Sequence, residues 1–280
     1  MINESVNIFV LNWNQKAMTL DCIKSLEKVT YNNSKIILID NGSTDGSVDL
    51  INEHFSNIEI IEVGDNLGYA GGNNYGFINS INQSKYSIFL NNDTVVSPNF
   101  IEPLIKALND DFSIKQSAPK ILFADKPNSL WFAGGYVNLF FGWIRHRGIR
   151  KIDKGQYDNN IIIDYATGCC FCMRSTDFEL FNMFDESFNM YGEDVDLSLR
   201  IQKFGGKTIY IPESKIWHKV SASIGGQFSF IKWKRKNIGK IKLIINNLNP
   251  IILPFALILN FTMIIVEIPI LIFMKFRKKL

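Results

Sequence analysis

Two groups of acidic residues stand where a folded chain could use them for chemistry. The first is Asp93, at the polar tip of the apolar run 86–93, which reads Tyr-Ser-Ile-Phe-Leu-Asn-Asn-Asp. Such a run is typical of a strand buried on both faces, and in an open α/β sheet ligands bind just beyond the carboxyl ends of these strands. There Asp93 can give a hard oxygen ligand to a divalent cation that holds phosphates. The alternative is that Asp93 only begins a turn before Pro98.

The second group is Glu193-Asp194-Val195-Asp196, which follows Gly192 and opens a predicted helix. The helix dipole favours acids in a first turn, so capping explains one or two of them. Three acids in four positions are more than capping needs. The pattern therefore indicates a function beyond helix stability.

Alternating strands and helices would position these acids. The apolar patterns predict strands over 6–12, 35–40, 58–63 and 86–90, and helices over 19–28, 47–55, 70–82 and 99–108. Strands that alternate with helices at this spacing form a mainly parallel sheet with helices on both faces. The predicted fold class is α/β.

The pattern becomes less regular after residue 115. The aromatic and Gly-rich stretch 131–150 predicts a long loop or a hairpin. Its aromatic faces and guanidinium groups could line a ligand groove, or the loop could have no assigned role. His54 and His146 are expected on the surface or in loops. Further strands are predicted over 161–166, 169–174 and 207–211, and a helix over 193–204.

The charge is unevenly distributed along the 280 residues. The net charge is +3, but residues 232–280 hold ten Lys or Arg and one acid, whereas residues 1–231 hold 20 basic and 26 acidic residues, a net of −6. This split suggests a basic tail that faces an anionic surface, not a nucleic-acid-binding core. No signal peptide is visible before the first apolar run, so we expect the core to stay in the cytoplasm.

The four cysteines are expected to be small buried thiols in a reducing compartment. Three of them, Cys169, Cys170 and Cys172, are too close for ordinary mutual disulfides. Together with Cys22 they also lack the paired spacing of a metal site.

The tail 251–274 is strongly apolar and is bracketed by basic residues over 232–242 and 275–279. Two prolines, an amide and an acid interrupt it, at Pro254, Asn260, Glu267 and Pro269. It falls short of the ~20 uninterrupted apolar residues of a spanning helix, and basic residues at both ends favour a hairpin or an in-plane anchor. A soluble helix pair packed on the core is the alternative. The predicted domains are a core over 1–230 and a membrane-association segment over 231–280.

The order of motifs along the chain resembles the family-2 glycosyltransferases with the GT-A fold, and in particular their rhamnosyltransferase-like branch. The resemblance covers almost the whole chain. It rests on Leu11-Asn12-Trp13-Asn14, Ile39-Asp40-Asn41-Gly42-Ser43-Thr44-Asp45-Gly46-Ser47, Asn66-Leu67-Gly68-Tyr69-Ala70-Gly71-Gly72-Asn73-Asn74, Leu90-Asn91-Asn92-Asp93, Tyr191-Gly192-Glu193-Asp194-Val195-Asp196-Leu197 and Trp217-His218-Lys219.

The resemblance implies a nucleotide-sugar donor at the ends of the first strands. An oxygen of Asp40 or Asn41 would accept the N3–H of a uracil- or thymine-type base, although Asn41-Gly42 also fits a tight turn. The glycine-rich loop would let the backbone approach the nucleotide, although a plain turn before a helix fits equally and the glycine spacing is not that of a dinucleotide fingerprint. The implied donor-binding residues are Asn12, Asp40, Asn41, Gly71, Gly72, Asn73, Asn91 and Asn92.

The resemblance also implies a metal site and a catalytic base. Asp93 corresponds to the last acid of the family's Asp-X-Asp and would bind Mg²⁺ or Mn²⁺, with His218 as a second ligand or, alternatively, as a structural residue. Asp194 would take the proton of the acceptor hydroxyl and invert the anomeric carbon. Glu193 would orient it, while Asp196 would support the loop.

The predicted function is therefore a metal-dependent inverting glycosyltransferase. It would move a sugar, preferably a rhamnose-like one, from a dTDP- or UDP-sugar to a saccharide acceptor. The expected acceptor is linked to a lipid, and the expected process is the synthesis of a bacterial cell-surface polysaccharide. It would work at the membrane surface, on the cytoplasmic face of the plasma membrane. A non-catalytic nucleotide-sugar-binding subunit is the alternative, and a nucleotidyltransferase is disfavoured because no Gly-rich basic signature follows the first strand.

Overall fold

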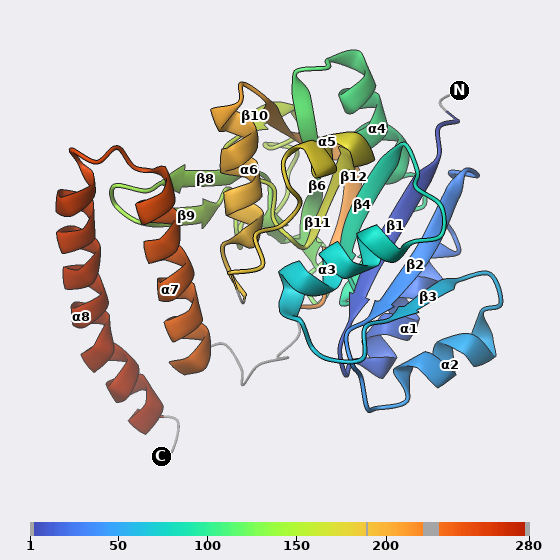
Figure 1. Cartoon of the computed structure of the whole chain (residues 1–280), viewed down its shortest axis with the longest axis horizontal. Coiled ribbons are helices and arrows are strands. Elements are labelled where there is room, and N and C mark those ends of the chain that lie inside the picture. Colours follow the sequence, from blue (N-terminus) through green and yellow to red (C-terminus); the bar gives the residue numbers. More distant parts are fainter. Residues whose placement is uncertain (1–2, 189, 221–229, 278–280) are drawn as a thin grey trace.

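A computed structural model describes residues 3–188, 190–220 and 230–277 of the chain (Figure 1). Its elements are β1 (Val6–Asn12), α1 (Lys16–Leu26), β2 (Ser34–Asp40), α2 (Ser47–His54), β3 (Glu59–Glu62), α3 (Gly68–Asn79), β4 (Tyr86–Asn91), β5 (Thr94–Val96), α4 (Ile101–Asp110), β6 (Ile114–Phe123), β7 (Leu130–Phe132), β8 (Gly135–Asn138), β9 (Trp143–His146), β10 (Ile161–Ile163), β11 (Cys170–Arg174), α5 (Ser175–Leu180), α6 (Glu193–Lys203), β12 (Lys207–His218), α7 (Phe230–Asn247) and α8 (Leu253–Arg277).

One mixed sheet forms the centre of the molecule, with strand order β10-β12-β6-β11-β4-β1-β2-β3. The half made of β1 to β4 is parallel, since β1 pairs in parallel with both β2 and β4, and β2 pairs in parallel with β3. Strand β11 runs antiparallel between β4 and β6, and β6 is parallel to β12. The small strands β5 and β7 join this sheet at β12 and β6. The predicted α/β class with a mainly parallel sheet is confirmed; β11 is an antiparallel strand inside it, and the short strands β5, β7 and β10 also pair antiparallel.

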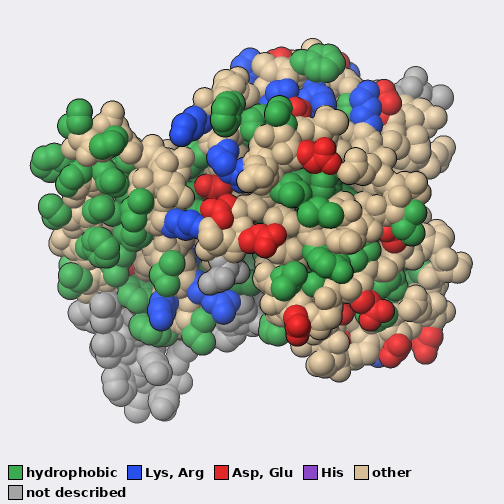
Figure 2. All heavy atoms as spheres, viewed as in Figure 1, with side chains coloured by type: hydrophobic (Ala, Val, Ile, Leu, Met, Phe, Trp, Pro, Cys, Tyr) green, Lys and Arg blue, Asp and Glu red, His purple; other side chains and the backbone are tan. Residues whose placement is uncertain are grey.

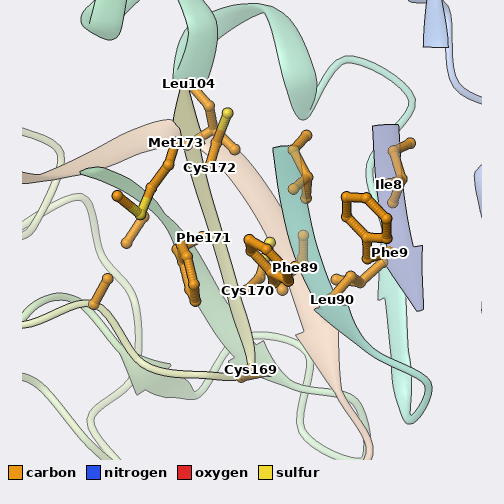
Figure 3. Close-up of a cluster of buried hydrophobic side chains, with 14 of the residues drawn as sticks. Ile8, Phe9, Phe89, Leu90, Leu104, Cys169, Cys170, Phe171, Cys172 and Met173 are labelled. Carbon is orange, nitrogen blue, oxygen red and sulfur yellow. The ribbon is translucent and has the colours of Figure 1, made fainter. Parts of the chain in front are cut away.

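A row of phenylalanines crosses three neighbouring strands and fills one face of the sheet. Strand pairing places Phe89 of β4 beside Phe9 of β1 and Phe171 of β11 (Figure 3). Phe77 of α3 and Phe178 of α5 pack on this row, with ring centres 6.5 and 4.5 Å from that of Phe89. Residues alternate between the two faces of a strand, so Cys170 and Cys172 point to the other face, which α4 covers. All four cysteines are free and buried, as predicted.

Strand β6 is the main element that the sequence did not predict. Polar residues interrupt its apolar pattern, yet Gln116 and Lys120 are both fully buried. The amide oxygen of Gln116 accepts hydrogen bonds from Ser198 and Thr208, and the Lys120 ammonium forms ion pairs with two aspartates. Polar side chains are tolerated in a core when they are hydrogen-bonded in this way.

The strand predicted over 207–211 is longer than expected. It continues as β12 to His218 through a register shift after Ile211. The extension pairs with β5, directly after the tip of β4, and carries His218 to that tip.

The last two helices lie beside the β8–β9 hairpin and α6 (Figure 1). A second apolar cluster joins these parts, made of Leu139, Tyr165, Phe188, Val195, Leu243, Ile244 and Ala256. The Asn260 amide on α8 also donates a hydrogen bond to the Phe140 carbonyl oxygen in the hairpin. The tail forms a pair of helices that packs on the core, and its association with a membrane stays a prediction. None of the helices in the described ranges has the length and apolar character needed to cross a membrane.

Candidate functional site

The carboxyl ends of β1, β2 and β4 share one buried hydrogen-bond network. The Asn12 amide nitrogen donates to Asp40 Oδ1 at 2.8 Å, and its amide oxygen accepts from Thr19 at 2.6 Å. The Asn92 amide nitrogen reaches both Asn12 and Thr19, at 3.1 and 2.8 Å. Asp40 Oδ2 accepts the Ser43 backbone N–H at 2.9 Å. Three of the predicted donor-binding residues, Asn12, Asp40 and Asn92, are therefore brought together in one hydrogen-bond network.

Asn41 ties the edge of the sheet to the loop in front of α3. Its amide nitrogen donates to Asn66 Oδ1 and to the Gly68 carbonyl oxygen, at 3.1 and 3.0 Å. Its amide oxygen accepts the Leu67 N–H at 3.0 Å. The side chain is buried and both ends of the amide hold this loop. Its contact with a nucleotide base stays a prediction.

The glycines of α3 let this helix lie close to the sheet. A Cβ on Gly72 would lie 2.6 Å from Leu11 Cδ1, and one on Gly71 would lie 2.8 Å from Leu67 Cβ. The structure thus gives both glycines a packing reason. Asn73 is buried and donates to a carbonyl within its own helix. Nucleotide binding by these three residues stays a prediction.

Asp93 and His218, the two predicted metal ligands, meet at the tip of β4. Oδ1 of Asp93 lies 3.0 Å from Nε2 of His218, and both side chains are nearly buried. Asn91 ends β4 just before them, with its side chain half-buried. Neighbouring ligands of an octahedral ion bound at about 2.1 Å lie about 3.0 Å apart, so this pair fits a divalent cation.

The rest of a metal shell would have to come from a ligand and from water. Within the ranges that the structure describes, no cluster of three or more His, Cys, Asp or Glu side chains suits a metal ion. A cation at Asp93 and His218 would therefore bind most tightly together with an oxygen-rich ligand such as a diphosphate. This agrees with the single anionic ligand expected from the sequence.

The two acids that open α6 are held at a buried helix N-terminus. Asp194 Oδ2 accepts the Gly168 N–H, and Oδ1 accepts the Val195 N–H, both at 2.8 Å. Burial raises the pKa of Asp194, although these two N–H groups oppose the shift. Burial and the neighbouring Asp194 also raise the pKa of Glu193, whose Oε2 is buried without a hydrogen-bond partner among the described residues. Groups with raised pKa values of this kind are candidates for proton transfer.

Residues 167–169 separate the proposed base from the proposed metal ligands. The Gly168 N–H binds Asp194, while the Cys169 carbonyl oxygen accepts the N–H of Asn91, two residues before Asp93. The Tyr69 hydroxyl donates to the Gly168 carbonyl oxygen at 2.6 Å. This turn therefore connects the donor-side loop of α3 with the base. Tyr69 belongs to the Asn-Leu-Gly-Tyr motif, but its role was not recognised from the sequence.

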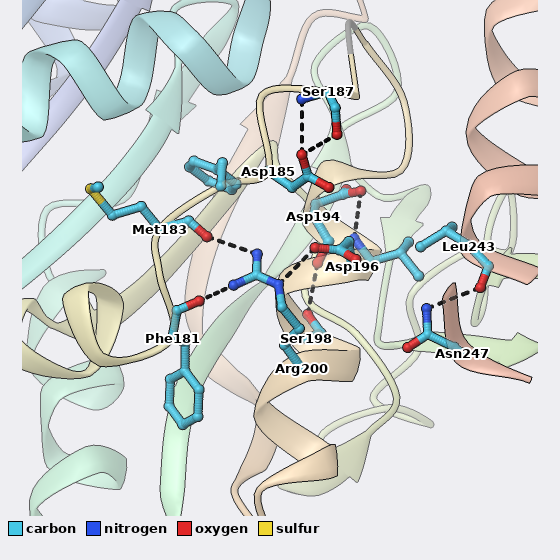
Figure 4. A network of polar contacts seen from close by, with 12 residues as sticks. Phe181, Met183, Asp185, Ser187, Asp194, Asp196, Ser198, Arg200, Leu243 and Asn247 are labelled. Carbon is cyan, nitrogen blue, oxygen red and sulfur yellow. Dashed lines mark hydrogen bonds and ion pairs between the residues drawn. The ribbon is translucent and has the colours of Figure 1, made fainter. Parts of the chain in front are cut away.

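Asp196 supports the loop before α6, as expected. Figure 4 shows the Arg200 guanidinium between Asp196 and two backbone carbonyls. Nε of Arg200 lies 2.7 Å from Asp196, Nη2 lies 2.7 Å from the Met183 carbonyl oxygen, and Nη1 bonds that of Phe181. The sequence does not reveal that Arg200 holds this loop, because the two carbonyl groups that it binds lie 17 and 19 residues away.

The prediction for His146 was wrong, whereas His54 is exposed as expected. His146 ends β9 and packs edge-on against Trp131, with ring centres 4.4 Å apart, and its Nδ1 lies 3.2 Å from the Trp131 carbonyl oxygen. Burial lowers its pKa to about 4. Trp131 also meets the His218 ring at 4.5 Å, whereas Trp143 is exposed under the guanidinium of Arg145. Aromatic side chains of 131–150 thus border the proposed metal ligands.

The family model for "Glycosyl transferase family 2" matches residues 7–181, well over half of the chain. The chain belongs to glycosyltransferase family 2. The matched range of this family-2 chain holds the donor-side network and Asp93. Asp194 and His218 lie beyond it, so their roles rest on the geometry and on motif order.

Relatives of this family-2 glycosyltransferase include rhamnosyltransferases. It is 26% identical over 227 residues to N-acetylglucosaminyl-diphospho-decaprenol L-rhamnosyltransferase of Mycobacterium tuberculosis, with 72% of each chain covered. It is 36% identical over 62 residues to rhamnosyltransferase WbbL of Escherichia coli, which is 22% of this chain and 24% of WbbL. The predicted resemblance to the rhamnosyltransferase-like branch is confirmed.

Solved glycosyltransferase structures share the fold. The crystal structure of GalNAc-T7 with UDP, GalNAc and Mn²⁺ aligns with a TM-score of 0.64 at 16% identity, over 77% of this chain and 43% of that one. The mannosyltransferase PcManGT of Pyrobaculum calidifontis with GDP-Man and Mn²⁺ aligns with a TM-score of 0.63 at 13% identity, over 92% and 74%. These likenesses confirm a GT-A-like fold.

Proposed function

We propose that this family-2 member is a metal-dependent, inverting glycosyltransferase. It would transfer a sugar, rhamnose-like by preference, from a dTDP- or UDP-sugar to a lipid-linked saccharide during the synthesis of a bacterial cell-surface polysaccharide. The observation that supports this best is the arrangement around residues 167–169. Asp93 and His218 lie on the β4 side of this turn, and Asp194 is hydrogen-bonded to its other side.

This arrangement suits an in-line displacement. Asp93 and His218 would hold Mg²⁺ or Mn²⁺, which would offset the charge of the leaving nucleoside diphosphate. Asp194 would accept the proton of the acceptor hydroxyl while the hydroxyl oxygen bonds the anomeric carbon and the bond to the diphosphate breaks. Attack from the face opposite the nucleotide inverts the anomeric configuration. The Gly168 N–H keeps Asp194 aimed during this step.

The relatives support a lipid-linked acceptor, since the mycobacterial relative is named for an acceptor on diphospho-decaprenol. The structure adds a surface suited to the lipid. Figure 2 shows hydrophobic side chains gathered over α8, where Phe255, Ile258 and Ile265 are each more than 60% exposed. Basic residues flank this apolar surface in the sequence. We propose that the protein works at the cytoplasmic face of the membrane and binds it through α7 and α8.

Thermal unfolding with nucleotides tests the donor site first. A ligand that binds only the folded state raises the melting temperature. We expect dTDP or UDP to raise it in the presence of Mn²⁺, with a smaller shift for the His218→Ala variant and little shift with GDP or NAD. The absence of a metal-dependent shift with any pyrimidine nucleotide would contradict the proposed donor. A shift without turnover would favour the non-catalytic subunit.

A further inference from the structure

Helix α7 has two different faces. One of them lies against the loop that leads into α6 and its proposed base, Asp194. A Cβ on Gly239 would lie 2.0 Å from the Tyr191 carbonyl oxygen, two residues before Glu193. One turn earlier, the Lys236 ammonium lies 5.3 Å from the centre of the Tyr191 ring. Residues three and four positions apart share a helix face, so Lys236 and Gly239 face the site together.

Lys236 is a cation without a carboxylate partner among the described residues. Its side chain is exposed, but partial desolvation beside Tyr191 and the nearby Lys232 lower the pKa of its ammonium group. Lys242, one to two turns further along α7, differs because it pairs with Asp185 at 3.1 Å. The charge of Lys236 is therefore available to an anionic ligand beside Tyr191, two residues before the acids that open α6.

The other face of α7 forms an apolar groove with α8, with a volume of about 480 Å³. Trp233, Ile238, Ile241, Ile245, Phe261 and Ile264 line it. Ile238 and Ile245 are more than half exposed. Such a surface is costly to leave in water and suits a hydrocarbon chain. The basic face and the apolar face thus lie on one helix, back to back.

We propose that α7 receives the lipid end of the acceptor, with Lys236 paired to a phosphate of its diphosphate and the α7–α8 groove holding a later part of its hydrocarbon chain, which passes around the helix. This inference rests on the proposed function and adds the residues that recognise the acceptor. The charge pattern agrees with it, because ten of the eleven charged residues from position 232 onward are basic. An amphiphile with an anionic head matches a cation beside Tyr191 on one face of α7 and an apolar groove on the other face.

Two acceptors that differ only in the lipid end test the role of Lys236. One is N-acetylglucosaminyl-diphospho-decaprenol, and the other is the same sugar as a neutral octyl glycoside; both are assayed in detergent with dTDP-rhamnose. Lys236→Gln should raise KM about tenfold for the diphosphate acceptor, since a charge-assisted pair is lost, and change KM less than about twofold for the octyl glycoside. Lys28→Gln is the control, because it removes the same charge from an exposed lysine behind α1, away from α7 and its groove, and it should change neither KM.

The outcomes separate this inference from its alternatives. An equal effect of Lys236→Gln on both acceptors would overturn the phosphate contact. Equal effects of Lys28→Gln and Lys236→Gln on the diphosphate acceptor would also overturn it and would point to a general effect of positive charge. A longer lipid chain should lower KM, and Ile238→Ser should make this decrease smaller. If the decrease is unchanged, the groove does not bind the lipid chain. No turnover of either acceptor by the unaltered protein would overturn the proposed function and this inference with it.

Discussion

The donor side and the acceptor side of the site are built in different ways. On the donor side, Asn12, Thr19, Asp40 and Asn92 bond one another in a closed network at the strand ends. On the acceptor side, the polar groups are incompletely paired within the described structure. Glu193 Oε2 has no hydrogen-bond partner there, and the acids that open α6 have raised pKa values.

The two sides therefore differ in how their side chains are held in position. Hydrogen bonds among the donor-side residues fix the positions of their side chains, so few of them would have to be ordered when a nucleotide-sugar binds. The acceptor side has buried polar groups whose hydrogen-bonding capacity is not fully used within the described residues. A bound substrate can supply the missing partners. Substitutions on the donor side should therefore mainly lower the free energy of unfolding, and substitutions on the acceptor side should mainly lower kcat.

The largest effect is expected on the acceptor side, from Asp194→Asn. The amide cannot accept the hydroxyl proton, so kcat should fall by about 10²- to 10⁴-fold while the nucleotide-induced rise in melting temperature is kept. Steady-state kinetics and thermal unfolding measure both. Asp49→Asn, on the exposed surface of α2, is the control. Near-normal turnover of folded Asp194→Asn would rule out this base.

On the donor side, Asn12→Ala should act mainly on stability. It removes the bond to Asp40 and leaves Thr19 and Asn92 without a shared buried partner, at a cost of about 1–3 kcal/mol in the free energy of unfolding. Chemical denaturation measures this, and Asn79→Ala is a control because the Asn79 amide is exposed. If unfolding is unchanged but turnover is lost, the proposed contrast between the two sides is wrong.

The half-buried His146, which packs on Trp131, predicts a pH dependence of stability. Its pKa is about 4 in the folded protein, below the ordinary 6.5, so the unfolded chain binds its proton first. The stabilisation is complete above about pH 6.5 and is lost as the pH falls toward 4, by about 1 kcal/mol between pH 7 and 5.5. His146→Asn should flatten this part of the curve, whereas His54→Asn should leave it unchanged. Parallel curves for wild type and His146→Asn would contradict the assignment.

The smallest effect is expected where the two sides meet, at Tyr69. Tyr69→Phe keeps the ring but removes the hydrogen bond to Gly168, whose N–H holds Asp194. One such bond corresponds to about a twofold to tenfold loss in kcat, with the donor-induced thermal shift unchanged. Tyr75→Phe on the same helix is the matched control, since Tyr75 is exposed. A loss of donor binding instead would place Tyr69 on the donor side alone.

The sequence predicted the donor half of the fold well because its signals are local. The strand predicted over 6–12 is β1, and β2 begins one residue before its predicted start. Apolar runs ending in polar residues also placed Asn12, Asp40 and Asp93 at one edge of the sheet. The network among them could be expected in position but not in detail, because Thr19 reaches it from inside a helix.

The acceptor half was less predictable because its contacts join distant parts of the chain. Strand β6 was missed since Lys120 is buried through carboxylates 33 and 38 residues away. The link from Tyr69 to Gly168 spans 99 residues. The acids of α6 were placed correctly, but the turn that aims them follows only from the three-dimensional structure.

The contact at Gly239 has a practical consequence for work with shortened forms of this protein. The helix α7 packs directly on the Tyr191 carbonyl oxygen, and its Leu243 and Ile244 complete the apolar cluster that holds Val195 of α6. A protein cut at residue 230, the predicted domain boundary, would expose this cluster and release the segment that leads into Glu193 and Asp194. Low activity of such a truncated enzyme would then report a misplaced base, even with every predicted catalytic residue still present.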